Sequence, residues 1–135
     1  MSAIEFSIIE KYFQISSDCY PQDIVMGSGD DAAVFAANRQ NKTLTSDFLH
    51  TKLNSSKTQS ADNSLHQLSA FLNKTSDIEH RYLLLNLSLT ETNEQWLAYF
   101  SESIHQILAD NNISLIGGDT TSGGDFIVYQ LLMIQ

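Results

Sequence analysis

Acidic side chains in glycine-rich stretches are the residues of this sequence best suited to chemistry. They lie in such stretches, or where apolar segments end, at Asp30, Asp31, Asp47, Asp119 and Asp125. Carboxylate oxygens are the ligands that magnesium takes, together with waters and substrate phosphates. All six glycines fall within 27–29 and 117–124, where they let the backbone approach a phosphate closely. Spacing alone gives ordinary Gly-Asp turns about equal weight.

Other chemistries find less support in the sequence. Neither glycine-rich stretch continues into Gly-Lys-Ser/Thr, so a Walker A phosphate loop is excluded. The four histidines form no spaced pair on one expected face, which argues against zinc. Cys19, the single cysteine, excludes an internal disulfide and a thiolate metal cage. No serine lies in a nucleophile elbow, so hydrolase chemistry is disfavoured.

Apolar spacing predicts the elements that would position these side chains. Helices are expected over 5–15, around 65–72, and between a cap at Thr92 or Asn93 and the pair Asn111-Asn112. Strands are expected at 24–26, 32–37, 42–49, 82–89, 113–116 and 126–134. Loops are expected over the polar stretch 54–62 and the glycine-rich stretch 117–125.

Helices and strands are interleaved, which indicates an α/β (α+β) fold with a mixed β-sheet and helices on one face. A length of 135 residues fits one domain, 1–135, with a single core. Trp96 and the apolar positions after it keep a helical register, so they are expected in that core.

Charge and hydropathy restrict the partners. A net charge of -9 with only seven Lys and Arg argues against nucleic acid and against an anionic membrane surface. No segment approaches the roughly 20 apolar residues that span a bilayer, and residues 1–10 lack the pattern of a signal peptide. We therefore expect a cytoplasmic protein with no nucleic-acid or membrane partner.

Four short segments stand in an informative order. They are Glu5-Phe6-Ser7, Gly27-Ser28-Gly29-Asp30-Asp31, Thr45-Ser46-Asp47 and Gly117-Gly118-Asp119-Thr120-Thr121. Their order and approximate spacing resemble those of thiamine-monophosphate kinases, within the AIR-synthase-like superfamily. The resemblance runs from about residue 5 to the end of the chain. Its most specific part is the pair of Gly-Asp-Asp and Gly-Gly-Asp-Thr-Thr motifs on either side of the Trp96 helix.

The resemblance implies an enzyme that transfers the γ-phosphoryl group of ATP to thiamine monophosphate, giving thiamine diphosphate. The implied Mg²⁺ ligands are Asp30, Asp31, Asp47 and Asp119. The implied phosphate-binding residues are Gly117, Gly118, Asp119, Thr120 and Thr121. The family fold also implies a homodimer whose sheets close into a barrel, with the nucleotide near the interface. Phosphoryl transfer relies mainly on positioning and charge neutralisation, which such a site would supply.

The sequence departs from the family pattern at three places. Alignment backward from Trp96 puts Leu72 where the family has a metal-binding aspartate; a gap could instead bring in Asp77, whose polar surroundings are typical of a loop. Segment 48–52 only partly matches the Gly-x-His-Phe expected after Asp47. The family's C-terminal domain is absent, so any activity is expected to need that half and a dimer.

Two other interpretations remain open. A non-catalytic homologue, acting as a dimeric nucleotide-binding or interaction module, is favoured by Leu72. A relative of aminoimidazole-ribotide synthase or selenophosphate synthetase is the third possibility. The helix start Glu5-Phe6-Ser7 and the Gly-Gly-Asp-Thr-Thr motif argue against that third possibility.

Overall fold

The computed structural model describes residues 8–13, 24–26, 34–35, 43–54 and 57–135. Its helical elements are η1 (Ile9–Phe13), α2 (Lys57–Lys74) and α3 (Glu94–Asp110). Its strands are β1 (Ile24–Met26), β2 (Val34–Phe35), β3 (Leu44–Lys52), β4 (His80–Ser88), β5 (Ser114–Thr121) and β6 (Phe126–Ile134). Among these ranges, no helix is long and apolar enough to cross a bilayer.

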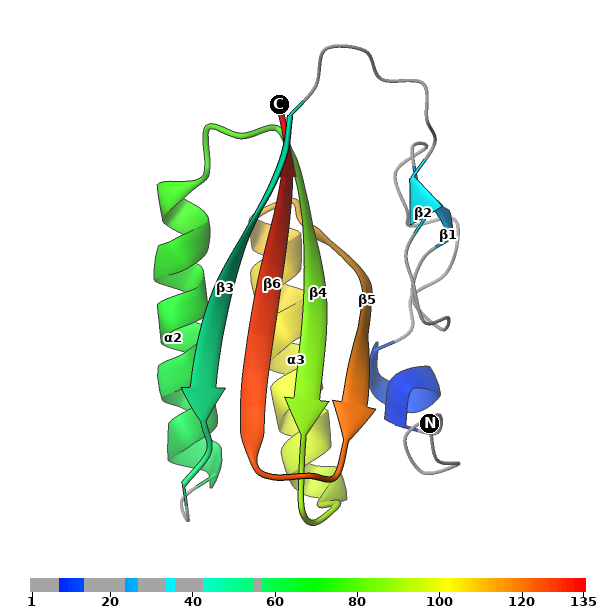
Figure 1. Cartoon of the computed structure of the whole chain (residues 1–135). Coiled ribbons are helices and arrows are strands. Elements are labelled where there is room, and N and C mark those ends of the chain that lie inside the picture. The colour runs from blue at the N-terminus through cyan, green and yellow to red at the C-terminus, as the bar shows by residue number, and fades with distance from the viewer. Residues whose placement is uncertain (1–7, 14–23, 27–33, 36–42, 55–56) are drawn as a thin grey trace.

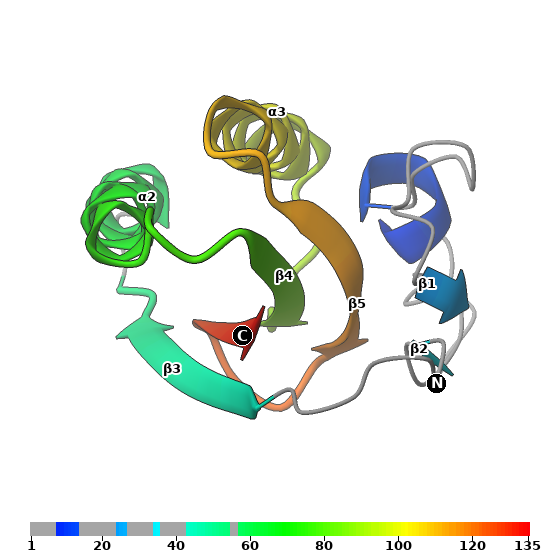
Figure 2. The same cartoon turned by 90° about the horizontal axis from the view of Figure 1, so that it is seen from above.

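A four-stranded sheet in the order β3-β6-β4-β5 forms the centre of the fold (Figure 1). β6 pairs antiparallel with both β3 and β4, whereas β4 and β5 are parallel. Helices α2 and α3 both lie on the same side of this sheet (Figure 2). The predicted mixed sheet with helices on one face is therefore confirmed. In the single chain this sheet is open, with β3 and β5 as its edges.

Helix α3 follows its predicted register. Its buried residues recur at helical spacing: Trp96, Leu97, Phe100, Ser101, Ile104 and Leu108. The Asn93 side chain caps the helix by accepting a hydrogen bond from the Trp96 N–H at 2.9 Å. The helix ends at Asp110, and Asn112 has a φ of 56°, in the left-handed region that asparagine tolerates. The predicted start and end of this helix are confirmed.

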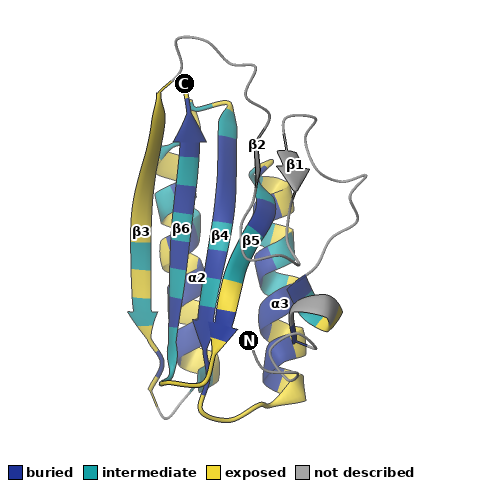
Figure 3. Ribbon diagram, turned by 45° about the vertical axis from the view of Figure 1, so that its right-hand side comes forward, coloured by how far each residue is buried: buried dark blue, intermediate teal, exposed yellow. Residues whose placement is uncertain are grey.

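The pleat of β4 and β6 divides their side chains between two faces. The face toward the helices bears the main core, in which Leu83, Tyr129 and Leu131 are fully buried. The opposite face, called the open face below, bears a smaller apolar group of Tyr82, Leu84, Ile116, Leu132 and Ile134. Figure 3 shows that β4 and β6 are largely buried, whereas β3 is largely exposed.

The loop expected over 54–62 is wrong in its second part, because α2 begins at Lys57. Two serines, Ser60 and Ser64, are buried on the face of α2 that also carries Ala61 and Leu68. Small polar residues on the core face thus conceal the helical period of the first turns. The expected fraying after Leu72 is confirmed, since the helix ends at Lys74 and turns follow.

The loop expected over 117–125 is also wrong in part, because β5 continues to Thr121. The strand stays paired with β4 through Gly117 and Gly118, two residues that sequence propensity places outside strands. The other expected strands agree to within a few residues, and the last one agrees at both ends. The expected first helix and the strand at 32–37 are only partly described, at η1 and β2.

Arg81, in β4, joins the C-terminal ends of the two helices. Its side chain is buried, and its Nη1 donates to the Leu72 carbonyl at 2.8 Å and to Thr75 Oγ1 at 3.1 Å. Its Nη2 donates to the Asn111 carbonyl at 2.9 Å. The last carbonyls of a helix have no intrahelical partner and carry partial negative charge. One guanidinium therefore satisfies both helix ends, and burial lowers the pKa of Arg81 without removing its charge.

Candidate functional site

The five residues expected to bind phosphate occupy the second half of β5. They are Gly117, Gly118, Asp119, Thr120 and Thr121. β5 is an edge strand that pairs with β4, and no strand of the described sheet pairs with its other side. An edge strand presents backbone N–H and C=O groups on its outer side. The motif is therefore located on an extended edge, and not on a loop as the sequence suggested.

Gly118 is required by the backbone itself. Its φ is 144°, and an added Cβ would lie 1.7 Å from the Leu85 carbonyl oxygen of β4. A Cβ on Gly117 would lie 3.0 Å from Leu84 Cδ2, which is tight but falls on a movable side chain. Gly118 is thus explained by close packing of β5 on β4, whether or not a phosphate is bound.

Asp119 is the accessible acid of this motif. Its side chain is exposed, and its Oδ1 accepts a hydrogen bond from the Thr120 N–H at 2.9 Å. Asp119 pairs with Asn86 on the open face, and Thr121 lies two residues further on the same face. Thr120 faces the helices instead and is buried. Asp119 and Thr121 can meet a ligand on the open face, whereas Thr120 can contribute only backbone.

Asp47 lies far from Asp119. It is exposed on the opposite edge strand, β3, where its Oδ1 accepts a hydrogen bond from the Phe48 N–H at 2.9 Å. Three inter-strand spacings separate the two edges, which amounts to about 14 Å. Asp47 also pairs with Leu131 on the helix side of the sheet, whereas Asp119 points to the open face. Within one copy of the chain, these two carboxylates cannot ligate the same ion.

The other expected metal ligands lie outside the described residues. Asp30 and Asp31, in the Gly-Asp-Asp segment, fall in the range 27–33. Among the residues that the structure does describe, no group of three or more His, Cys, Asp or Glu side chains is placed to hold a metal ion. The expected ligand set of Asp30, Asp31, Asp47 and Asp119 therefore stays a prediction.

Leu72, for which the sequence comparison above expected a metal-binding aspartate in the family, belongs to the core. It lies near the C-terminal end of α2 and is fully buried. An ionised carboxylate among the apolar side chains of the main core would be strongly destabilising, because it would lose its hydration. Asp77, the alternative ligand, lies in the exposed turn after α2, as its polar surroundings predicted.

Asp125 makes a set of contacts that the sequence did not reveal. Its carboxylate accepts hydrogen bonds from the Thr90 N–H at 2.9 Å and from Thr90 Oγ1 at 2.8 Å. The Lys57 Nζ lies 3.4 Å from its Oδ1. The bonds from Thr90, the backbone one first, hold the pKa of Asp125 below its ordinary value, and Lys57 adds to this effect. Asp125 thus connects the β5–β6 turn to the start of α2 and to the end of β4.

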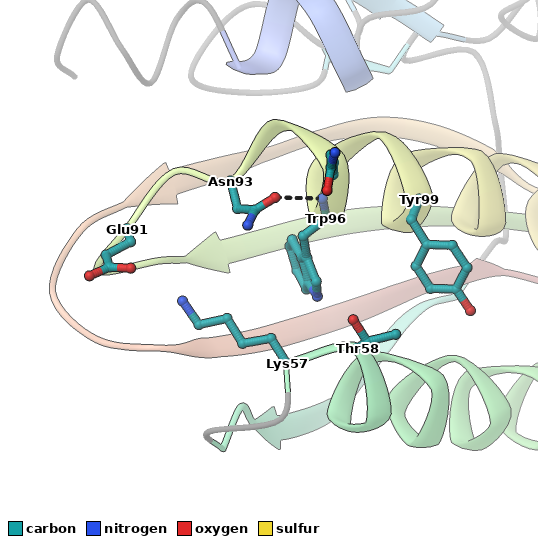
Figure 4. Close-up of a pocket in the computed structure, with 7 residues that line it drawn as sticks. Lys57, Thr58, Glu91, Asn93, Trp96 and Tyr99 are labelled. Atoms are coloured by element: carbon teal, nitrogen blue, oxygen red, sulfur yellow. Dashed lines mark hydrogen bonds between the residues drawn. The ribbon is translucent and has the colours of Figure 1, made fainter.

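A pocket of about 520 Å³ opens between the first turns of α2 and α3 (Figure 4). Its lining residues are Lys57, Thr58, Glu91, Asn93, Gln95, Trp96 and Tyr99. Trp96 is buried and stacks on Phe100 with ring centroids 5.1 Å apart, which confirms the expected core role. Its Nε1, however, has no hydrogen-bond partner among the described residues. No sequence signal marked this pocket, because its residues come from separate segments.

Comparison with known proteins agrees with the fold. Residues 29–134 match the family described as AIR synthase related protein, N-terminal domain. The thiamine-monophosphate kinase of Buchnera aphidicola is 32% identical over 129 aligned positions, and the match covers 91% of this chain and 39% of that protein. The corresponding enzyme of Escherichia coli strain K12 is 31% identical over 128 residues, again 39% of its length. The chain thus spans about two-fifths of the curated relatives that it matches.

Solved structures give the same result. The crystal structure of thiamine-monophosphate kinase from Stenotrophomonas maltophilia K279a has a TM-score of 0.67 and 26% identity, covering 87% of this chain and 39% of that one. The hydrogenase maturation protein HypE of E. coli, at 15% identity and a TM-score of 0.53, covers 94% and 40% and shares the fold alone. The chain therefore belongs to the AIR synthase related protein family, of which it contains the N-terminal domain.

Proposed function

We propose that this chain is the N-terminal part of a thiamine-monophosphate kinase, which transfers the γ-phosphoryl group of ATP to thiamine monophosphate and releases thiamine diphosphate. The observation that carries the proposal is the 32% identity with the Buchnera kinase across 91% of the chain. Because the relatives are more than twice as long, we assign this chain one part of the reaction: holding magnesium-ATP. We also propose a cytoplasmic location, as expected from the sequence.

In this proposal the nucleotide phosphates lie over the open face near β5. Asp119 would hold Mg²⁺ there, and the backbone of Gly117 with the Thr121 hydroxyl would lie near phosphate oxygens. Asp30 and Asp31 would complete that metal shell, and Asp47 would hold a separate ion or act from a second copy. Magnesium, when bound, neutralises charge on the phosphates; the protein's own part is to fix their position.

We further propose a homodimer that covers the open face. β3 exposes two large apolar side chains, Leu44 and Phe48, each 60% exposed. Register places both of them on the open face, beside Ile134 and Gln130 of β6. Large apolar side chains exposed on one face of a sheet, next to a partly buried apolar group, are typical of interaction surfaces. Two such faces, packed together, would bury the smaller apolar group of each sheet.

Light scattering tests the dimer. Phe48→Asp should shift the native chain from dimer to monomer, because a charge would enter the apolar interface. Thr45→Asp, on the same strand but on its other face, is the matched control and should remain dimeric. A native chain that is monomeric at all accessible concentrations would refute the proposed interface.

Calorimetric titration of magnesium-ATP tests nucleotide binding. We expect saturable, magnesium-dependent heat for the native chain and its loss in Asp119→Asn. Asp110→Asn is the control, since Asp110 is an exposed aspartate at the end of α3 that accepts a hydrogen bond from Gln106 Nε2 at 2.9 Å. Transfer itself is tested by joining this chain to the remaining part of the Buchnera kinase and measuring thiamine diphosphate. Equal binding by Asp119→Asn would contradict the proposed metal role.

A second candidate function is a non-catalytic dimeric module. The observation that favours it is the complete burial of Leu72, where the family pattern has a metal-binding aspartate. On this alternative, the chain forms the dimer and either binds magnesium-ATP without catalysis or acts only as an interaction module, and the chimaeric enzyme forms no thiamine diphosphate. Formation of thiamine diphosphate by the chimaeric enzyme would exclude it.

A further inference from the structure

The pocket between α2 and α3 contains an unused hydrogen-bond donor. Trp96 is only 6% exposed, and its Nε1 has no acceptor among the described residues. An indole N–H can donate but cannot accept, and burying it without an acceptor costs free energy. In Figure 4 the nitrogen edge of the Trp96 ring points toward Lys57 and Thr58. The buried donor therefore faces two further side chains that can donate hydrogen bonds.

Both helices direct their N-terminal ends at this pocket. Lys57 and Thr58 are the first residues of α2, and its first turn contains no acidic residue. Gln95 and Trp96 belong to the first turn of α3, where Asn93 accepts the Trp96 N–H. The first N–H groups of a helix lack intrahelical partners and carry partial positive charge. The pocket thus combines two helix ends, of which that of α3 bears the acidic Glu94, with one ammonium group and one indole N–H.

We propose that this pocket binds a small oxyanion, a carboxylate or a phosphate group, through Lys57 Nζ, the Thr58 hydroxyl and the Trp96 indole N–H. All three are donors, which matches a ligand whose oxygen atoms only accept. The pocket lies on the helix side of the sheet, whereas Asp119 lies on the open face. This site is consequently separate from the proposed nucleotide site.

Acidic side chains near the pocket affect how strongly it can bind an anion. Asp125 forms a salt bridge with Lys57 at 3.4 Å and also accepts two hydrogen bonds from Thr90. Lys57 can therefore swing toward a ligand while Asp125 keeps its Thr90 bonds. Glu91, exposed on the rim, opposes an anion. Because the Trp96 nitrogen is covered, an entering oxygen reaches it only when a neighbouring side chain moves.

Trp96 is the only tryptophan of the chain, so its fluorescence reports on this pocket alone. Sodium phosphate and sodium acetate are titrated separately without magnesium, and sodium chloride holds the ionic strength constant. We expect a saturable change in Trp96 emission with one oxyanion or with both. Tighter binding of phosphate identifies a phosphate group as the ligand chemistry, and tighter binding of acetate identifies a carboxylate. A response to chloride equal to that of both oxyanions would overturn the proposal.

Charge variants sharpen this test. Lys57→Met should weaken binding roughly tenfold, the effect of one charge-assisted hydrogen bond, whereas Lys57→Arg should retain it. Glu91→Gln should strengthen binding about twofold, because an exposed charge acts weakly. Lys74→Met, an exposed lysine at the other end of α2, is the control and should leave affinity unchanged. If Lys57→Met and Lys74→Met bind alike while both melt as the native chain does, the assignment of Lys57 is wrong.

Discussion

The two ends of the α2–α3 layer satisfy their helix termini in different ways. At the C-terminal ends, the buried Arg81 donates to the carbonyls of both Leu72 and Asn111. At the N-terminal ends, Lys57 and Asp125 are about one-quarter exposed, and the Trp96 Nε1 has no described partner. At the C-terminal ends, called the closed end below, a buried cation is hydrogen-bonded to backbone carbonyls. At the N-terminal ends, called the open end below, hydrogen-bond donors line a pocket. Stability and ligand access are therefore expected to reside at opposite ends of the same two helices.

The largest effect should follow from placing charge in the closed end. Leu72→Asp introduces a carboxylate into a fully buried position, and we expect a loss of more than about 4 kcal/mol of unfolding free energy. Leu72→Met, which conserves volume, should cost less than about 1.5 kcal/mol. Urea unfolding monitored by circular dichroism measures both. A stable Leu72→Asp variant would show that this part of α2 can rearrange toward the family's metal site.

Removal of the shared cation should have the next largest effect. Arg81→Met leaves the Leu72 and Asn111 carbonyls without their charged donor, and we expect a loss of about 3 kcal/mol. The unfolding free energy of Arg81→Lys should lie between those of the native chain and of Arg81→Met, because a lysine ammonium cannot reproduce the planar fork of donors. The same urea experiment applies. If Arg81→Met were neutral, the contrast between a closed and an open end would not hold.

At the open end we expect smaller losses. Asp125→Ala removes acceptors for Thr90 and Lys57, which should cost about 1.5 kcal/mol at pH 7. Because the folded pKa of Asp125 is lowered, its contribution is complete above the unfolded pKa and is lost as pH falls through the folded value. The difference between the native chain and the variant should thus begin to shrink as pH falls below about 4, and it should disappear below the folded pKa of Asp125. A gap that persists at lower pH would exclude the carboxylate as its cause.

The smallest predicted change concerns the cap of α3. Asn93→Ala removes the acceptor of the Trp96 N–H and should cost about 1 kcal/mol. Asn73→Ala, at an exposed position near the end of α2, is the matched control and should be nearly neutral. Thermal melting of both variants measures the difference. Equal effects would mean that the capping bond contributes nothing at this open end.

Elements with unmixed apolar periodicity were predictable from sequence. α3 keeps apolar residues at helical spacing from Trp96 to Leu108, and β6 is nearly continuous in apolar side chains. The first turns of α2 were not predictable, since Ser60 and Ser64 occupy core positions. Gly118 led to a wrong prediction for a different reason. In a sequence, a glycine that close strand packing requires cannot be told from a glycine in a loop.

The candidate sites depended on long-range contacts to different degrees. The Gly-Gly-Asp-Thr-Thr motif was visible because its residues are consecutive, although its extended conformation was not. The separation of Asp47 from Asp119 follows from strand order, which periodicity does not encode. Lys57, Thr90 and Asp125 meet only after three segments assemble, and the role of Arg81 depends on two helix ends. Neither the contacts of Asp125 nor those of Arg81 are indicated by any short segment of the sequence.

The central place of β6 bears on how the chain folds during synthesis. β3 is made well before β6, yet β6 is its only strand partner in the described sheet. Until β6 emerges from the ribosome, β3 has unpaired backbone groups together with the apolar side chains of Leu44 and Phe48. Such an unpaired strand is a point of self-association, and pairing distant strands is slow. Nascent chains halted before residue 126 should therefore aggregate or bind chaperones, whereas chains that include β6 should not.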